Sequence, residues 1–193
     1  MVSPSEAAAF VLQQAWARPP TLGDGRLLCV DGPGGSGKST LAQACVETAG
    51  GGARLVHMDD LYDGWSGLAT VGDQLDTLLR PLAAGEPGSY RRYDWHGHAY
   101  AETVTVPPSS LVVLEGVGSG ARECTDLCTL LVWVAAPSDL RLTRGIDRDG
   151  ELLRAQWLRW REDEEAHFAR DGTLQRVDVL VDGTGLDRPR LRS

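Results

Sequence analysis

This chain of 193 residues lacks several features that would place it in other classes of protein. Its formal net charge is −8, whereas a nucleic-acid-binding surface is usually basic. The longest strictly apolar run, Leu130 to Ala136, is far shorter than the roughly 20 residues that span a bilayer. The N-terminus lacks the basic flank of a secretory signal. We expect a cytoplasmic protein with no nucleic-acid or membrane partner, and a homo-oligomer stays possible.

Two residue types are scarce in an informative way. The 4 cysteines form no Cys-x-x-Cys pair, so neither a zinc site nor a disulfide framework is predicted. Asparagine is absent, and Lys38 is the only lysine among the 19 basic residues. The Asn-Lys-x-Asp box that selects guanine therefore cannot occur, which excludes a GTPase switch of that type.

Apolar patterning alternates between strands and helices along the chain. The runs at 111–114 and 129–134 are apolar throughout, as in strands that are buried on both faces of a parallel sheet. Further strands are expected at 26–31, 54–58, 103–106 and 177–181, and helices at 5–17, 38–49, 71–82, 139–147 and 151–169. No repeat or linker divides the chain, and the tail after Asp187 is expected to fray. The prediction is one α/β domain over residues 1–193, with a doubly wound parallel β-sheet flanked by helices.

One segment matches a nucleotide-binding motif in full. Residues 32–39 (GPGGSGKS) fit G-x-x-x-x-G-K-[ST] and lie between a predicted strand and a predicted helix. In such a P-loop the backbone N–H groups and the helix N-terminus face phosphate oxygens, the lysine neutralises the β- and γ-phosphates, and the serine holds Mg²⁺. The alternative is a glycine-rich turn that only joins a strand to a helix. The residues expected to bind ATP are Gly32, Gly34, Gly35, Ser36, Gly37, Lys38, Ser39 and Thr40.

Acidic residues follow two of the predicted strands. Asp59 and Asp60 come after the strand at 54–58, where one of them could accept the proton of an attacking hydroxyl. Glu115 follows the strand at 111–114, the position of a Walker B acid that orients Mg²⁺. The alternatives are an acidic surface turn that caps a helix and a strand-end acid that faces solvent.

Three arginines share one face of the helix expected at 139–147. Arg141, Arg144 and Arg148 recur at i, i+3 and i+7, and like charges on one face repel unless they share an anion. An arginine-rich helical lid over about 137–170, inserted before the last strand, would use such a face to neutralise a transferred phosphoryl group. Otherwise the face is solvated and paired with nearby aspartates.

Aromatic and basic side chains alternate between residues 90 and 100. Tyr93, Trp95 and His98 combine two ring faces with an imidazole, a set that suits a planar ligand. The alternative is a hairpin that packs on the edge of the core.

Taken together, these segments resemble the uridine kinase and phosphoribulokinase group of P-loop kinases over roughly residues 25–185. The resemblance is carried by the P-loop, Asp59-Asp60-Leu61-Tyr62, Tyr93-Asp94-Trp95 with His98, Glu102 to Val106, Glu115-Gly116 and the 141–149 segment. It implies that Asp59 is the general base and an acid of the Mg²⁺ shell, and that Glu115 is the second such acid. It also implies acceptor contacts from Tyr62, Tyr93, Trp95 and His98, lid roles for Arg141, Arg144 and Arg148, and a last strand beside the adenine.

The chain departs from this family pattern at two places. An Asn/Asp-His-Pro-Asp-like box that holds the ribose hydroxyls in uridine kinases is missing, and residues 63–68 stand there instead. The Glu-Arg-Gly-Arg-like stretch of the lid is also absent. We therefore expect an ATP- and Mg²⁺-dependent small-molecule kinase whose acceptor is a ring-bearing, nucleoside-like alcohol, with uridine at best a poor substrate. The alternatives are a kinase of another small alcohol, such as a sugar, vitamin precursor or antibiotic, and a non-catalytic ATP-binding sensor.

Overall fold

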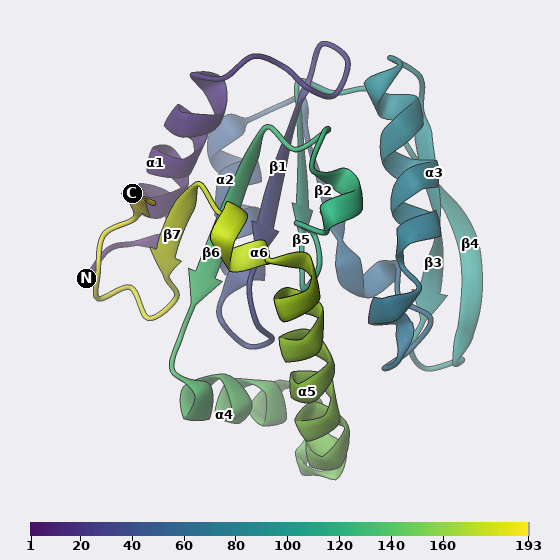
Figure 1. Cartoon of the computed structure of the whole chain (residues 1–193), viewed down its shortest axis with the longest axis vertical. Helices are drawn as coiled ribbons and strands as arrows, with labels where there is room; N and C mark the ends of the chain where they lie inside the picture. The colour runs from purple at the N-terminus through teal and green to yellow at the C-terminus, as the bar shows by residue number, and fades with distance from the viewer. Residues whose placement is uncertain (193) are drawn as a thin grey trace.

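A central sheet organises the computed structural model, which describes residues 1–192 (Figure 1). Its strand order is β2-β5-β1-β6-β7-β8. The first five of these strands are parallel, and β8 pairs antiparallel with β7. The strands are β1 (Arg26–Asp31), β2 (Ala53–His57), β5 (Leu111–Glu115), β6 (Leu130–Ala135), β7 (Val179–Asp182) and β8 (Arg190–Leu191).

The two faces of this sheet belong to two cores. Side chains of β1 alternate between them: Leu27 and Cys29 join one core, and Leu28 and Val30 join the other. The second core is completed by helices α1 (Pro4–Trp16) and α2 (Lys38–Ala49). The first core is completed by α3 (Gly72–Ala83) and α5 (Arg154–Asp171), among other segments. Helices thus cover both faces, and the predicted doubly wound sheet is confirmed.

A separate two-stranded sheet lies beside α3 (Figure 1). It consists of β3 (Gly88–Asp94) and β4 (Ala99–Val106), so the strand expected at 103–106 is only the end of a longer one. Tyr90 and Val106 of this hairpin are buried in the core. The aromatic segment therefore is a hairpin at the core edge, and whether it also contacts a ligand depends on individual rings.

The chain between β6 and β7 is helical. It contains α4 (Ser138–Asp149), α5 and α6 (Thr173–Arg176), and α4 with the start of α5 lies below the carboxyl ends of the strands in Figure 1. Short 3₁₀ turns are η1 (Met58–Asp60), η2 (Gly67–Ala69), η3 (Arg122–Cys124) and η4 (Glu151–Leu153). No helix within residues 1–192 is long and apolar enough to cross a membrane.

The expectation of a frayed tail is wrong. Leu191 pairs with Val179 across β7 and β8, and the main-chain N–H of Val2 donates to the Gly185 oxygen at 2.8 Å. Backbone hydrogen bonds therefore hold Leu191 at the sheet edge and Val2 against the loop after β7, a long-range effect that the local composition does not reveal.

Candidate active site

The loop between β1 and α2 has the shape of an anion-binding cradle. All eight residues predicted to bind ATP lie in this loop or in the first turn of α2. Gly37 adopts φ 103°, a conformation that side-chain-bearing residues rarely reach. No side chain caps the N-terminus of α2, so its first N–H groups remain available to a ligand.

Two polar side chains of the loop fit a phosphate ligand. The Nζ atom of Lys38 donates to the Pro33 carbonyl at 3.0 Å, although the residue is only 7% exposed. The Oγ atom of Ser36 is buried with no hydrogen-bond partner. Buried donors without full satisfaction are costly, and phosphate oxygens would supply the missing acceptors.

Glu115 lies at the centre of a group of polar residues at the carboxyl edge of the sheet. Strand register places it beside His57, and its Oε1 lies 2.5 Å from His57 Nδ1. The same oxygen accepts a hydrogen bond from Ser39 Oγ at 3.1 Å. The hydrogen bond to the carboxylate raises the pKa of His57. Ser39 and Glu115, each predicted to bind Mg²⁺, thus lie within hydrogen-bonding distance of each other, and His57 is an addition that sequence reasoning missed.

Asp59 follows β2 in the η1 turn, where its side chain reaches solvent. Desolvation by the surrounding protein raises the pKa of this carboxyl, and the negative charge of Glu115 raises it further. The positive charges of Arg148, Lys38 and His57 oppose this rise. Two carboxylates that repel each other are the donor set that a divalent cation relieves.

The site has few protein ligands for a metal. Within residues 1–192, no three or more His, Cys, Asp or Glu side chains gather as a metal-binding group. Mg²⁺ commonly binds one or two carboxylates and completes its shell with water and substrate phosphates. Ser39, Asp59 and Glu115 suit that kind of site, and their role as metal ligands stays a prediction.

Aromatic residues of the hairpin hold the turn that carries Asp59. Trp95 Nε1 donates to the Asp59 carbonyl at 2.9 Å, and the Tyr100 hydroxyl donates to the Leu61 carbonyl at 3.3 Å. The Tyr90 hydroxyl lies 3.5 Å from Asp60 Oδ2. Asp60 therefore faces the hairpin, whereas the charge of Glu115 acts on the Asp59 carboxyl.

An aromatic wall connects the hairpin with α5. The Trp65 ring centroid lies 5.7 Å from that of Trp95 and 6.0 Å from those of Trp157 and Trp160. Tyr93 packs edge-on against Trp95 at 5.4 Å. Trp65 comes from the segment that replaces the missing ribose-binding box, and nothing in the sequence marked it as a partner of these rings.

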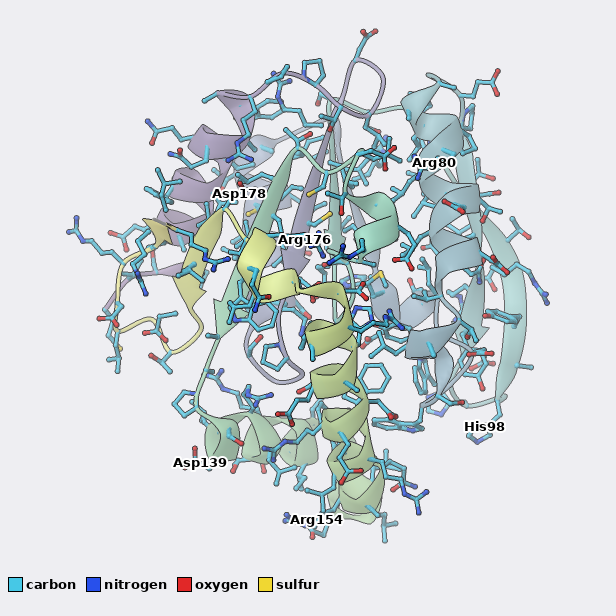
Figure 2. The ribbon with its side chains drawn as sticks, viewed as in Figure 1. Arg80, His98, Asp139, Arg154, Arg176 and Asp178 are labelled. Atoms are coloured by element: carbon cyan, nitrogen blue, oxygen red, sulfur yellow. The ribbon has the colours of Figure 1, made fainter. Side chains whose placement is uncertain are left out.

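Two predicted acceptor residues lie elsewhere. Tyr62 is 1% exposed, packs on Trp160, and donates its hydroxyl proton to the Val117 carbonyl at 2.5 Å. This placement gives no support to an acceptor contact, because the core encloses the ring. His98 stands in the hairpin turn and points away from the rest of the chain (Figure 2). In this conformation its imidazole does not join the aromatic wall.

The lid arginines separate into two groups. Arg141 pairs with Glu164 at 3.0 Å, and Arg144 donates to the carbonyls of Gly35 and Gly183 at 3.3 and 3.2 Å. Arg148 is mostly exposed and pairs with Asp149 at 2.7 Å, as the alternative of a solvated face predicts. Its charge nevertheless opposes the rise in the pKa of Asp59. Two of the three arginines therefore already contact the P-loop or its neighbours.

A cavity of about 370 Å³ opens beside the start of α2. Thr40, Arg144, the 182–185 loop and the N-terminal residues Val2 to Pro4 line it. A pocket of this size next to a phosphate cradle suits the base of a nucleotide.

Two buried carboxylates were not predicted. Asp31 accepts hydrogen bonds from the backbone N–H groups of Gly32, Gly118 and Gly120 at 2.7, 3.0 and 2.8 Å. Burial raises its pKa to about 6. Its position at a strand end directly before the P-loop was a usable signal. The second buried carboxylate is Glu164, and no sequence pattern distinguishes it from the other acidic residues of α5.

Comparison with known proteins shows the family of this chain. The model of the phosphoribulokinase / uridine kinase family matches residues 56–152. A uridine kinase of Deinococcus deserti is 30% identical over 186 residues, covering 84% of this chain and 89% of the relative. This chain belongs to the phosphoribulokinase / uridine kinase family. It is therefore a P-loop kinase. Membership of the family does not identify the acceptor.

Solved structures share the fold. A possible uridine kinase from Bacillus stearothermophilus superposes with a TM-score of 0.65 at 22% identity, over 92% of this chain and 98% of that one. A candidate fructose transport system kinase from Silicibacter sp. gives a TM-score of 0.60 at 19% identity, over 90% and 92% of the two chains. The two neighbours bear names with different acceptors, so the fold alone does not select one.

Proposed function

We propose that this member of the family is a kinase that uses ATP and Mg²⁺ to phosphorylate a hydroxyl of a ring-bearing, nucleoside-like alcohol. The observation that carries the proposal is the hydrogen bond from Ser39 to Glu115 in the turn after the P-loop lysine, together with the charges of Glu115 and Lys38 that act on the Asp59 carboxyl. A sensor would need the P-loop but not a carboxylate that is free to accept a proton.

The chemistry needs few protein groups. Asp59 accepts the proton of the acceptor hydroxyl, the acceptor oxygen forms a bond to the γ-phosphorus, and the bond from that phosphorus to the β-phosphate oxygen breaks to release ADP. Lys38 and the P-loop amides hold the phosphates, and Arg141 and Arg144 are close enough to the loop to neutralise charge on them. Mg²⁺, when bound by Ser39 and the two carboxylates, would offset the charge that develops on the phosphates.

The aromatic wall supports the acceptor class. Trp65 and Trp95 are half-buried rings within reach of the Asp59 turn, and the buried Tyr93 packs behind Trp95. Stacking on such rings favours a planar heterocycle over a ring-free polyol. Trp65 fills the segment where ribose-binding residues would stand, which supports the expectation that uridine is a poor substrate.

A screen of acceptors tests the proposal. Thermal shifts would be measured for nucleosides, sugars, vitamins and polyols in the presence of Mg²⁺ and β,γ-imido-ATP, since a ligand at 100 times its Kd stabilises by about 2.7 kcal/mol. Hits would then be assayed for ADP release with ATP. We expect ADP release to depend on a ring-bearing alcohol. Efficient phosphorylation of a ring-free polyol would contradict the acceptor class, and ATP binding without transfer to any acceptor would favour a sensor.

A further inference from the structure

Glu164 is a buried carboxylate for which the proposed chemistry has no use. It is only 3% exposed, and its Oε2 accepts a hydrogen bond from the backbone N–H of Gly34 in the P-loop at 2.7 Å. Its Oε1 pairs with Arg141 at 3.0 Å. Burying a carboxylate is costly unless it is paired and hydrogen-bonded, so these two contacts with the P-loop and Arg141 are needed to hold Glu164 in place.

The orientation of one peptide group shows on which side of the loop Glu164 lies. The Pro33–Gly34 peptide bond is trans, so its C=O and N–H point in opposite directions. Lys38 Nζ donates to the Pro33 oxygen at 3.0 Å, and Glu164 accepts the Gly34 N–H. The carboxylate therefore lies across the peptide from the ammonium group, outside the phosphate cradle rather than within it.

Neighbouring contacts restrain residue 34 and the peptide that follows it. Arg141 Nη1 lies 3.5 Å from the Gly34 carbonyl oxygen while it pairs with Glu164. A Cβ atom on Gly34 would lie 2.8 Å from a ring carbon of Trp157. Glu164, Arg141 and Trp157 thus enclose residue 34. A rotation of the Pro33–Gly34 peptide would break two charge-assisted hydrogen bonds, one to Lys38 and one to Glu164.

From this geometry we infer that Glu164 is a positioning residue that orients the Pro33–Gly34 peptide, and through its carbonyl the Lys38 ammonium, toward the phosphates of the donor nucleotide. The inference rests on the proposed function, because it presupposes a bound triphosphate. Glu164 touches neither substrate in this role. It acts by holding the carbonyl that anchors Lys38.

Binding of Mg²⁺ and β,γ-imido-ATP, measured by calorimetry, tests the inference in a double-mutant cycle of Glu164→Gln and Lys38→Ala. We expect Glu164→Gln to weaken binding about tenfold, the equivalent of one weakened charge-assisted hydrogen bond. The same substitution in a Lys38→Ala chain should change the affinity less than about twofold, because the group through which it acts is gone. Glu165→Gln, an exposed neighbour on the same helix, is the matched control and should bind like wild type.

Each other outcome has a definite meaning. Equal weakening in both backgrounds, or a loss of thermal stability without loss of affinity, would show a structural role and overturn the inference. Tighter binding by Glu164→Gln would place the carboxylate in competition with phosphate and also overturn it. A wild-type chain that bound neither this analogue nor ADP would instead refute the proposed function. If Glu164→Gln fails to fold, Glu164→Gln/Arg141→Met, which leaves neither buried charge unpaired, is compared with Arg141→Met in the same cycle.

Discussion

The indole Nε1 of Trp95 donates a hydrogen bond to the main-chain oxygen of Asp59 across 2.9 Å. A residue first predicted to stack on an acceptor therefore also holds the backbone of the predicted general base. Its ring still packs between Trp65 and Tyr93, so loss of the whole side chain would disturb both functions.

Replacement of Trp95 by Phe separates these two roles, because Phe keeps an aromatic ring but has no N–H donor. We expect kcat to fall by up to about tenfold, the effect of one lost hydrogen bond, with a smaller change in the acceptor KM. Trp95→Ala should raise the acceptor KM as well and leave ATP affinity nearly unchanged. Trp65→Phe alters an adjacent ring without touching the Asp59 carbonyl and is the control. An unchanged kcat in Trp95→Phe would show that the Trp95 hydrogen bond does not position Asp59.

The two acids after β2 should differ in their importance. The Asp59 carboxyl is subject to the charge of Glu115, whereas Asp60 lies against the Tyr90 hydroxyl. Asp59→Asn should therefore lower kcat strongly with a modest effect on ATP binding, and Asp60→Asn should have a much smaller effect. Steady-state kinetics of both variants gives the comparison. A larger loss for Asp60→Asn would show that Asp59 is not the base.

Lys38 should be essential for transfer but not for folding. Its ammonium donates to the Pro33 carbonyl within the same loop, so this hydrogen bond does not join two elements of the core. We expect Lys38→Ala to reduce turnover by about 10²-fold or more, with unchanged circular dichroism. Turnover at the wild-type rate would contradict the P-loop assignment.

Asp31 should make stability depend on pH. Burial raises its pKa to about 6, well above the usual range of an aspartate, so the folded chain binds this proton more tightly than the unfolded chain. The free energy of unfolding should therefore fall as pH rises from about 4 to 6, by on the order of 3 kcal/mol, and level off above.

Urea denaturation between pH 4 and 7.5 checks this, with Asp31→Asn as the non-titrating reference. Only the difference between the two chains is diagnostic, because other carboxyl groups titrate in both. A difference that does not change with pH would show that Asp31 has an ordinary pKa.

Local sequence determined the elements and the nucleotide-binding loop of this protein. The apolar runs that became β5 and β6, the helix that begins at Lys38 and the position of Glu115 at a strand end all follow from patterns a few residues long. Such patterns reflect backbone preference and burial periodicity, which neighbouring residues largely set. The P-loop is predictable for the same reason, since one continuous segment supplies its glycines and its lysine.

Only the tertiary structure decided which side chains meet. His57 reaches Glu115 because β2 and β5 pair in a particular register, and Glu164 reaches Gly34 because α5 packs against the loop although the two residues are 130 positions apart in the chain. Tyr62 turned into the core, although its neighbours Asp59 and Asp60 did not. These outcomes depend on the packing of segments that are distant in the chain, and the local pattern of each segment permits many partners.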